Sequence, residues 1–265
     1  MPNSMLISTL REEAASIAKA QPSTKLNWMY ATKGIDHMPA QEFTREDALE
    51  HRRFMREKLS DRTLKCRLGD LSTIWNWGID EGRIESNPWA NMGKRIKVED
   101  KEHPEFPFEH YAKFHNHPLF MAIWYHGFRI SEIANISSEE IVLDAEIPYF
   151  RLRHNNVRRL KNQSSKRDIP IYKGYLPFII DRQLVLDNQN PRAGDNFSRS
   201  LKHHTGVSAH SIRHQFRSRM AEAGIEYSTQ MALMGHLGEG MTAKYGKVKL
   251  KTKKKALSKV NKIIE

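Results

Sequence analysis

The sequence predicts a mainly helical protein of two domains, the second of which contains a small antiparallel sheet. Apolar residues recur at helical spacing through the first third of the 265-residue chain. A charged segment with two prolines, GKRIKVEDKEHPEFPF at 93–108, interrupts this pattern. Beyond it, EIPYFRLR at 146–153 and RDIPIY at 167–172 have strand character. The second part is therefore predicted to be a mixed α+β domain.

The domain boundaries follow from these changes in pattern. We expect a helical domain at 1–95, a linker at 96–108, a mixed domain at 109–246 and a basic tail at 247–265. No internal repeat is visible, and the tail sequence KVKLKTKKK is the one tract of low complexity.

Two helices of the first domain are marked by their apolar stripes and their ends. The segment 44–59 begins at Thr44, a plausible N-cap with an acidic residue three positions on. The segment 62–79 carries one apolar stripe and is expected to end before Gly82. This stripe consists of Leu64, Leu68, Leu71, Ile74, Trp75 and Ile79. Trp75, Trp77 and Trp89 are interpreted as core residues rather than as platforms for stacked bases.

In the second domain, a buried helix is expected at 110–128, ending at Gly127. The two strands enclose a basic turn at 154–166. A further helix at 208–224 repeats Ile212, Phe216, Met220 and Ala223 on one face, with Ser208 as its cap and Gly224 as its stop. A short helix is expected at 228–235.

Composition excludes several classes of protein. No apolar run approaches the roughly 20 residues of a membrane span. The start of the chain lacks the features of a secretion signal. The single Cys66 excludes an intramolecular disulfide and a zinc site built from cysteines. We therefore expect a soluble, cytoplasmic protein.

The charge pattern is the first indication of function. The formal net charge is +12 and the isoelectric point is about 9.7. Residues 1–95 contain 15 basic and 13 acidic residues (+2), and residues 96–265 contain 28 and 18 (+10). Surplus lysine and arginine favour a polyanionic partner such as nucleic acid, although the same surplus can simply keep a surface soluble.

Polar side chains that suit a phosphate recur through the second domain. His210 and Arg213 are three residues apart, so they are expected to share an outward face of their helix. Alone, such a pair usually marks a solvated surface. It gains weight from Arg129 and His236, which each follow closely on a glycine, and from Tyr245, nine residues after His236.

Each of these residues also has a less specific interpretation. Arg129 follows an apolar helix and could simply complement the helix dipole. His210 and His214 have a spacing that can bind zinc, but no third ligand is evident, so a metal site is not expected. Tyr227 is interpreted as a packing or turn residue, because it lacks the preceding Gly-His pair that Tyr245 has.

Taken together, these motifs resemble those of the tyrosine recombinase (phage integrase) family. The resemblance rests on Arg129 in GFRISEI, a lysine in the turn between the strands, HSIRHQF at 210–216, and the Gly-His pair before Tyr245. The segment STIWNWGIDEGRIESNPW at 72–89 resembles the core-binding domain of that family. The resemblance implies a SAM-like helical core-binding domain, followed by a catalytic domain with the DNA breaking-rejoining fold.

The resemblance also implies a role for each residue. Tyr245 would attack a DNA phosphodiester and form a 3′-phosphotyrosyl link, without metal, ATP or another cofactor. Arg129 and Arg213 would hold the nonbridging oxygens. Lys161 would protonate the leaving 5′ oxygen, although Arg158, Arg159 and Lys166 compete with it in the same basic turn. The remaining assignments are His210 to the tyrosine proton or the phosphate, His236 to the phosphate or the nucleophile, and Glu132 to the orientation of an arginine or histidine. We expect Arg158, Arg159 and Lys166 to contact DNA.

The expected activity is site-specific recombination that integrates or excises a prophage or genomic island. The resemblance implies paired duplex sites, a homotetramer on DNA and an accessory protein that bends DNA. The tail at 247–265 either docks on a neighbouring protomer, as in relatives, or is a solvated basic end. The rival functions are relaxation of DNA by a type IB topoisomerase and DNA binding by a module whose catalytic residues are vestigial.

Overall fold

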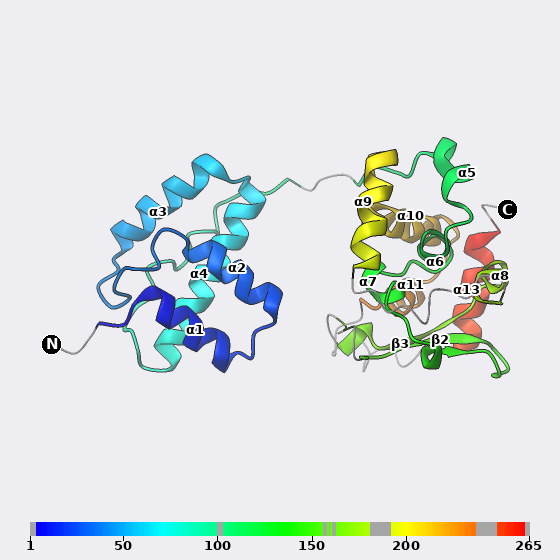
Figure 1. The fold of residues 1–265 in the computed structure, drawn as a ribbon, viewed down its shortest axis with the longest axis horizontal. Coiled ribbons are helices and arrows are strands. Elements are labelled where there is room, and N and C mark those ends of the chain that lie inside the picture. Colours follow the sequence, from blue (N-terminus) through cyan, green and yellow to red (C-terminus); the bar gives the residue numbers. More distant parts are fainter. Residues whose placement is uncertain are drawn as a thin grey trace. The chain divides into compact units, whose positions relative to one another are not determined.

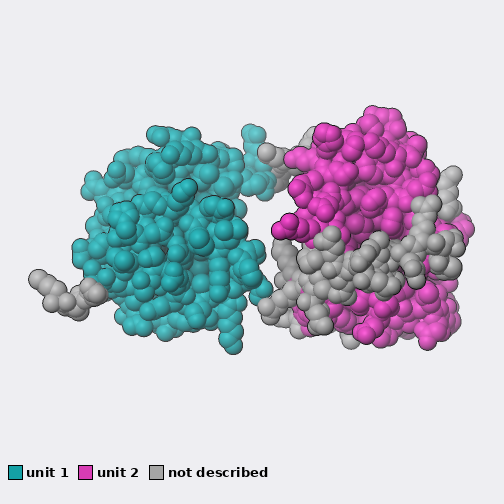
Figure 2. All heavy atoms as spheres, viewed as in Figure 1, with its two compact units in different colours: residues 1–101 teal, residues 102–265 magenta. Residues whose placement is uncertain are grey.

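The computed structural model describes residues 4–99, 103–155, 158, 160, 163–180, 192–236 and 248–262. The chain forms two compact units, residues 1–101 and 102–265, shown as a ribbon in Figure 1 and as spheres in Figure 2. The division falls within the charged segment 93–108. Most described residues are helical and the second unit contains an antiparallel sheet, so the predicted fold class is confirmed.

The first unit is built around one long helix. Its helices are α1 (Ile7–Ile17), α2 (Pro22–Thr32), α3 (Arg45–Lys58) and α4 (Asp61–Asp80). α4 contacts the other three, which it can do because its apolar stripe is buried. Thr44 caps α3 by a reciprocal pair of hydrogen bonds with Asp47, as the sequence predicted.

The tryptophans of the first unit differ in burial. Trp75 and Trp89 are buried and pack edge to face, which confirms the prediction that they are core residues. Trp77 is only partly buried. The prediction for Ile79 is wrong, because its side chain lies on the surface where α4 comes to its end.

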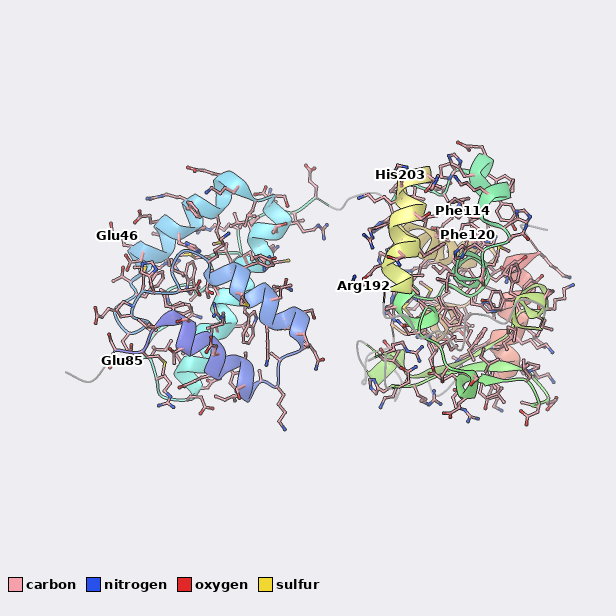
Figure 3. All side chains as sticks on the ribbon, in the orientation of Figure 1. Glu46, Glu85, Phe114, Phe120, Arg192 and His203 are labelled. Carbon is pink, nitrogen blue, oxygen red and sulfur yellow. The ribbon has the colours of Figure 1, made fainter. Side chains whose placement is uncertain are left out.

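The second unit contains many short elements before its longer helices. They are η1 (Phe108–His110), α5 (Tyr111–Phe114), α6 (Pro118–His126), α7 (Ile130–Ile133), η2 (Ser138–Glu140), β1 (Ile141–Val142), β2 (Tyr149–Leu152), η3 (Gln163–Ser165), β3 (Arg167–Pro170), η4 (Lys173–Tyr175) and α8 (Leu176–Ile180). They are followed by α9 (Ala193–Thr205), α10 (Ala209–Glu222), α11 (Tyr227–Met234) and α13 (Leu250–Asn261). Figure 3 labels Arg192 and His203 near the two ends of α9.

The single helix predicted at 110–128 is wrong, because the chain breaks it at 115–117. Pro118 is the first residue of α6, and the His117 side chain caps that helix by accepting from the Leu119 amide. Proline lacks an amide proton and its ring obstructs the preceding turn, so a helix can begin there but cannot run through it. The predicted end at Gly127 is confirmed.

The sheet has the order β1-β2-β3, with both pairs antiparallel. The pairing of β2 with β3 agrees with the two predicted strands, and β1 adds a short strand that the sequence analysis missed. On β2, Phe150 and Leu152 are buried and alternate with the more exposed Tyr149 and Arg151. This inner face of the sheet joins the core of the unit.

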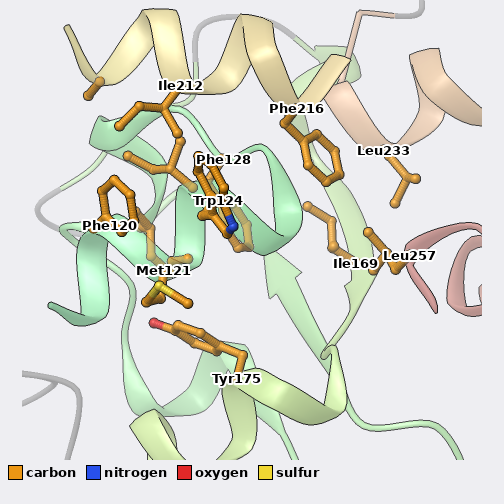
Figure 4. Packing of buried hydrophobic residues seen from close by; sticks show 14 of the residues in the cluster. Phe120, Met121, Trp124, Phe128, Ile169, Tyr175, Ile212, Phe216, Leu233 and Leu257 are labelled. Atoms are coloured by element: carbon orange, nitrogen blue, oxygen red, sulfur yellow. The ribbon is translucent and has the colours of Figure 1, made fainter. Parts of the chain in front are cut away.

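The core of the second unit surrounds α10. Ser208 caps this helix, and Ile212, Phe216, Met220 and Ala223 are buried as predicted. Figure 4 shows Ile169 of β3, Leu233 of α11 and Leu257 of α13 gathered near Phe216. α13 thus packs on its own chain through Ala256, Leu257 and Val260. The apolar Ile263 and Ile264 of the same tail lie outside the described residues.

None of the helices in the described ranges is both long enough and apolar enough to cross a membrane.

We predict that Gly127→Ala destabilises the second unit by about 2 kcal/mol more than Gly206→Ala. Both glycines have a left-handed backbone, with φ of 67° and 73°. A Cβ at Gly127 would lie 2.3 Å from the buried Phe216 ring, whereas a Cβ at Gly206 would have no atom within 4 Å. Denaturant unfolding of both variants measures the difference, and equal destabilisation would contradict the packing described.

Candidate active site

Arg129 lies at the junction of two short helices. α6 ends at Gly127 in a left-handed conformation, and Arg129 is the N-cap residue of α7. The Glu132 carboxylate, one turn later, accepts a hydrogen bond of 2.9 Å from the Arg129 amide. This local bond folds the carboxylate back to the start of α7, where the helix dipole also favours a negative charge.

The Glu132 carboxylate is buried among three guanidinium groups. Its side chain is 3% exposed. Arg129 donates to Oε1 at 2.7 Å, and Arg167 donates to both oxygens at 3.0 and 2.9 Å. Arg213 Nη1 lies 3.8 Å from Oε2. One carboxylate therefore joins α7, β3 and α10, and we call these four residues the Glu132 cluster.

The surroundings of Glu132 keep it ionised. Burial alone would raise the pKa of the carboxyl group. The charge of Arg167 and its hydrogen bonds, the charge of Arg213 and the Arg129 amide outweigh burial and lower the pKa to about 2. Glu132 is thus an anion at neutral pH that pairs with the neighbouring guanidinium groups.

Arg213 is buried, so the prediction that it faces outward with His210 is wrong. Its side chain is 1% exposed and donates to the carbonyls of Gly127 and Met234. Burial, and then the charges of Arg129 and Arg167, lower the pKa of Arg213 to about 9, which leaves it charged at neutral pH. His210 is exposed on the same helix.

His236 is held directly against Arg213. α11 ends at Gly235 in a left-handed conformation, and the next residue places its Nε2 atom 3.1 Å from Arg213 Nη2. Burial, and then the charges of Arg213 and Arg129, lower the pKa of His236 to about 4. In a neutral ring, Nε2 accepts this hydrogen bond from Arg213 and the ring proton is on Nδ1. Nδ1 can then donate a hydrogen bond to another group.

Gly235 is required where it lies. Its φ is 65°, and a Cβ there would come within 2.7 Å of Arg167 Nη1 and 3.1 Å of the Ser164 carbonyl oxygen. Arg129 Nη2 approaches the Gly235 carbonyl at 3.5 Å, and Ser164 Oγ donates to the same carbonyl at 3.3 Å. The turn before His236 is thus packed directly against the Glu132 cluster.

His210 lies in a group of three histidine rings. Its ring centre is 4.6 Å from that of His214 and 5.7 Å from that of His103, and the last two rings are stacked at 3.8 Å. Burial, and then the charges of His103 and His210, lower the pKa of His214 to about 4. Across the described ranges, no group of three or more His, Cys, Asp or Glu side chains is arranged to hold a metal ion.

Arg158 and Lys166, two basic residues of the turn between β2 and β3, differ in exposure. Arg158, which we expected to contact DNA, is instead buried and bonded to Glu140, to the Glu132 carbonyl and to the Arg153 carbonyl. It therefore stabilises the turn from within. Lys166 is exposed and open to a partner. Lys161, Arg159 and Tyr245 lie outside the described residues.

Arg167 is the member of the site that the sequence analysis missed. Its Nε donates to the Leu233 carbonyl at 2.8 Å, in addition to the two bonds to Glu132. The signal was present in strand alternation, because Arg167 lies two residues before the buried Ile169 and so points to the same face. An arginine on an inward face needs a buried anion, and Glu132 is that anion.

The second unit thus combines a mostly helical scaffold and a small antiparallel sheet with three guanidinium groups gathered around one buried carboxylate. A family model described as the phage integrase family matches residues 105–251, more than half of the chain. The chain therefore belongs to the phage integrase family, the tyrosine recombinases, and its class of activity is DNA recombination.

Individual relatives agree with this assignment. A tyrosine recombinase XerC of Neisseria meningitidis is 22% identical over 225 residues, which cover 74% of this chain and 72% of the relative. The Tn1549 transposon integrase in complex with transposon right end DNA has a similar fold, with a TM-score of 0.64 and 18% identity over 98% of this chain and all of that one. A lambda integrase tetramer bound to a Holliday junction has a TM-score of 0.63 and 15% identity, covering 94% and 81%.

We predict that Glu132→Gln destabilises the second unit by about 3 kcal/mol at pH 7, because the folded pKa lies well below the ordinary carboxyl value. For a lowered pKa, the stabilisation is complete above the unfolded value of 4.5 and is lost as pH falls toward about 2. Unfolding free energies of the two proteins should therefore converge as pH falls through this range. A difference that does not change with pH would contradict the assignment.

Proposed function

We propose that the chain cleaves and rejoins duplex DNA at specific sites through a 3′-phosphotyrosyl intermediate, with Tyr245 as the nucleophile. The observation that carries this proposal is the charge of the Glu132 cluster. Three guanidinium groups surround one carboxylate, leaving an excess of two positive charges beside a neutral His236. Buried charge without a counterion is costly, and a phosphodiester under attack carries the negative charge that would balance it.

We propose different tasks for the arginines of the Glu132 cluster. The Arg129 side chain is 19% exposed, so it remains accessible to a ligand. Arg213 is occupied by two carbonyls and by His236. We therefore assign direct contact with the nonbridging oxygens to Arg129 and to His236 Nδ1. Arg213 supplies charge and fixes the ring of His236.

Each step of the proposed reaction replaces one phosphoester bond with another. The phenol oxygen of Tyr245 bonds to phosphorus while the bond from phosphorus to the 5′ oxygen breaks. The tyrosine proton passes to His210, and Lys161 gives a proton to the departing 5′ oxygen. Attack by a 5′ hydroxyl on the phosphotyrosine reverses these steps and reseals a strand. Because one phosphoester replaces another, the cycle needs neither ATP nor a metal ion.

The setting we propose is integration or excision of a mobile element such as a prophage or genomic island. The transposon integrase was solved with transposon right end DNA, and the lambda integrase tetramer with a Holliday junction. By analogy, four copies of this chain would act on paired duplex sites, with an accessory protein bending the DNA. The exposed Lys166, with Lys161 and Arg159 of the same turn, would contact the DNA backbone.

We predict that Tyr245→Phe abolishes a covalent protein–DNA adduct while changing the dissociation constant for DNA by less than about threefold, because phosphate contacts hold the duplex. The substrate is a nicked half-site that loses its 5′ fragment on cleavage, and gel electrophoresis under denaturing conditions detects the adduct. Tyr227→Phe is the matched control, since Tyr227 is an exposed tyrosine of the same unit. It should form the adduct normally.

The same assay separates the rival functions. Joint products between two sites indicate a recombinase, whereas relaxation of supercoiled DNA without joint products indicates a topoisomerase. DNA binding without any adduct would identify a binding module and overturn the proposed chemistry. An adduct that survives Tyr245→Phe would overturn the choice of nucleophile.

A further inference from the structure

The helix α13 has two faces of different chemistry. One face packs on β3, α11 and α10, and includes the buried Ala256, Leu257 and Val260. The other carries five exposed lysines, which we call the lysine face: Lys251, Lys254, Lys255, Lys259 and Lys262. With Glu146, Ile147 and Ser258, these lysines line an open hollow of about 500 Å³.

The lysine face is electrostatically unfavourable within the isolated chain. Lys251, Lys255 and Lys259 follow one another at intervals of four residues, so like charges are neighbours on the helix surface. The first turn of α13 contains no acidic residue, and Lys251 places a positive charge near the positive end of the helix dipole. Two local rules are thus broken together, a combination that typically marks a functional surface.

Little on the protein compensates this charge. In the ranges that the structure describes, no ion pair involves any member of the lysine face, and Glu146 is the single acidic residue lining the hollow. Lys259 differs from the others, because its amine lies beside Gly224 at the carbonyl end of α10. Because Lys259 contacts the end of α10, substitutions at the other four lysines are better suited to test the function of the lysine face.

We propose that the lysine face of α13 binds the phosphate backbone of duplex DNA at a place separate from the Glu132 cluster. Lys251 and Lys262 lie about 16 Å apart along the helix axis, and DNA carries one phosphate per about 1.7 Å of its axis, so several phosphates come within reach. Lysines act as flexible point charges, which suits contact with a backbone regardless of sequence.

The chemistry of α13 disfavours a membrane surface or a protein as its partner. A membrane-surface helix inserts its apolar face, but the apolar face of α13 is buried in the core of the unit. A protein partner is usually anchored by aromatic or large apolar side chains, and Ile147 is the one apolar side chain lining the hollow. A phosphate backbone needs charge alone.

The lysine face is not an extension of the proposed active site. Lys253, on the buried face of α13, donates to the Asp168 carbonyl of β3 at 2.8 Å, next to Arg167. The lysine face lies on the opposite side of the helix and therefore points away from the Glu132 cluster. The lysine face would therefore hold a second stretch of duplex DNA. This inference rests on the proposed function only in that the chain binds DNA.

Protection of lysines from acetylation tests the site directly. The folded full-length chain is treated with limiting acetylating reagent, with and without a duplex that has no recombination site, and each lysine is quantified by mass spectrometry. Duplex DNA should lower the modification of Lys251, Lys254 and Lys255 at least fivefold. Lys113, Lys173 and Lys202, exposed lysines elsewhere on the same unit, should change less. Unchanged modification of the lysine face on a DNA-bound protein would overturn the proposal.

A triple variant gives an independent measure. Lys251→Gln/Lys254→Gln/Lys255→Gln should reduce the slope of log affinity against log salt by about 2 to 3, since each phosphate contact contributes roughly 0.9. Lys113→Gln/Lys173→Gln/Lys202→Gln is the charge-matched control. The first variant should melt no lower than wild type, because like charges are removed from one helix. Equal slopes for the two variants would overturn the proposal.

The outcomes also distinguish this proposal from the proposed function. If the triple variant forms the covalent adduct on a short half-site as wild type does and shows the reduced salt slope, both proposals are supported. A protein that forms no adduct but shows protection of the lysine face loses the proposed chemistry alone. Protection by polyglutamate or anionic vesicles but not by duplex DNA would identify another partner and overturn the inference.

Discussion

The salt bridges of Glu132 are the constraint on which the candidate active site depends. Arg129, Arg167 and Arg213 come from α7, β3 and α10, and their mutual repulsion would drive these elements apart without an anion between them. The single carboxylate holds the elements together but neutralises only part of this charge, and the proposed phosphate would neutralise the rest. Structural stability and the proposed phosphate binding therefore arise from the same group.

Two glycine turns of the second unit bring these elements close. Gly127 lets α6 turn sharply under Phe216, and Gly235 lets the end of α11 pass directly over Arg167. Both turns present backbone carbonyls that accept from arginines of the cluster. The end of α11 therefore places His236 against Arg213. Tyr245 follows nine residues later in the sequence.

The sequence predicted the scaffold better than the site. The stripe of α4, the caps at Thr44 and Ser208 and the two paired strands follow from local periodicity, and the structure agrees with them. Arg213 was misplaced because it borders the apolar stripe of α10, and the buried side of this helix extends beyond that stripe to include Arg213. Arg158 was misjudged because a basic turn looks solvent-exposed until its buried partner, Glu140, is known. Such partners are distant in sequence, so tertiary contacts alone reveal them.

The coupling free energy between Glu132 and Arg167 tests the central role of the buried carboxylate most directly. A double-mutant cycle with Glu132→Gln, Arg167→Met and the combined variant, read by denaturant unfolding at pH 7, isolates the interaction of the two side chains. The account predicts a coupling of about 3 kcal/mol or more, because each single change leaves a buried charge without its partner. A coupling near zero, with additive losses, would contradict the claim that Glu132 organises the arginines.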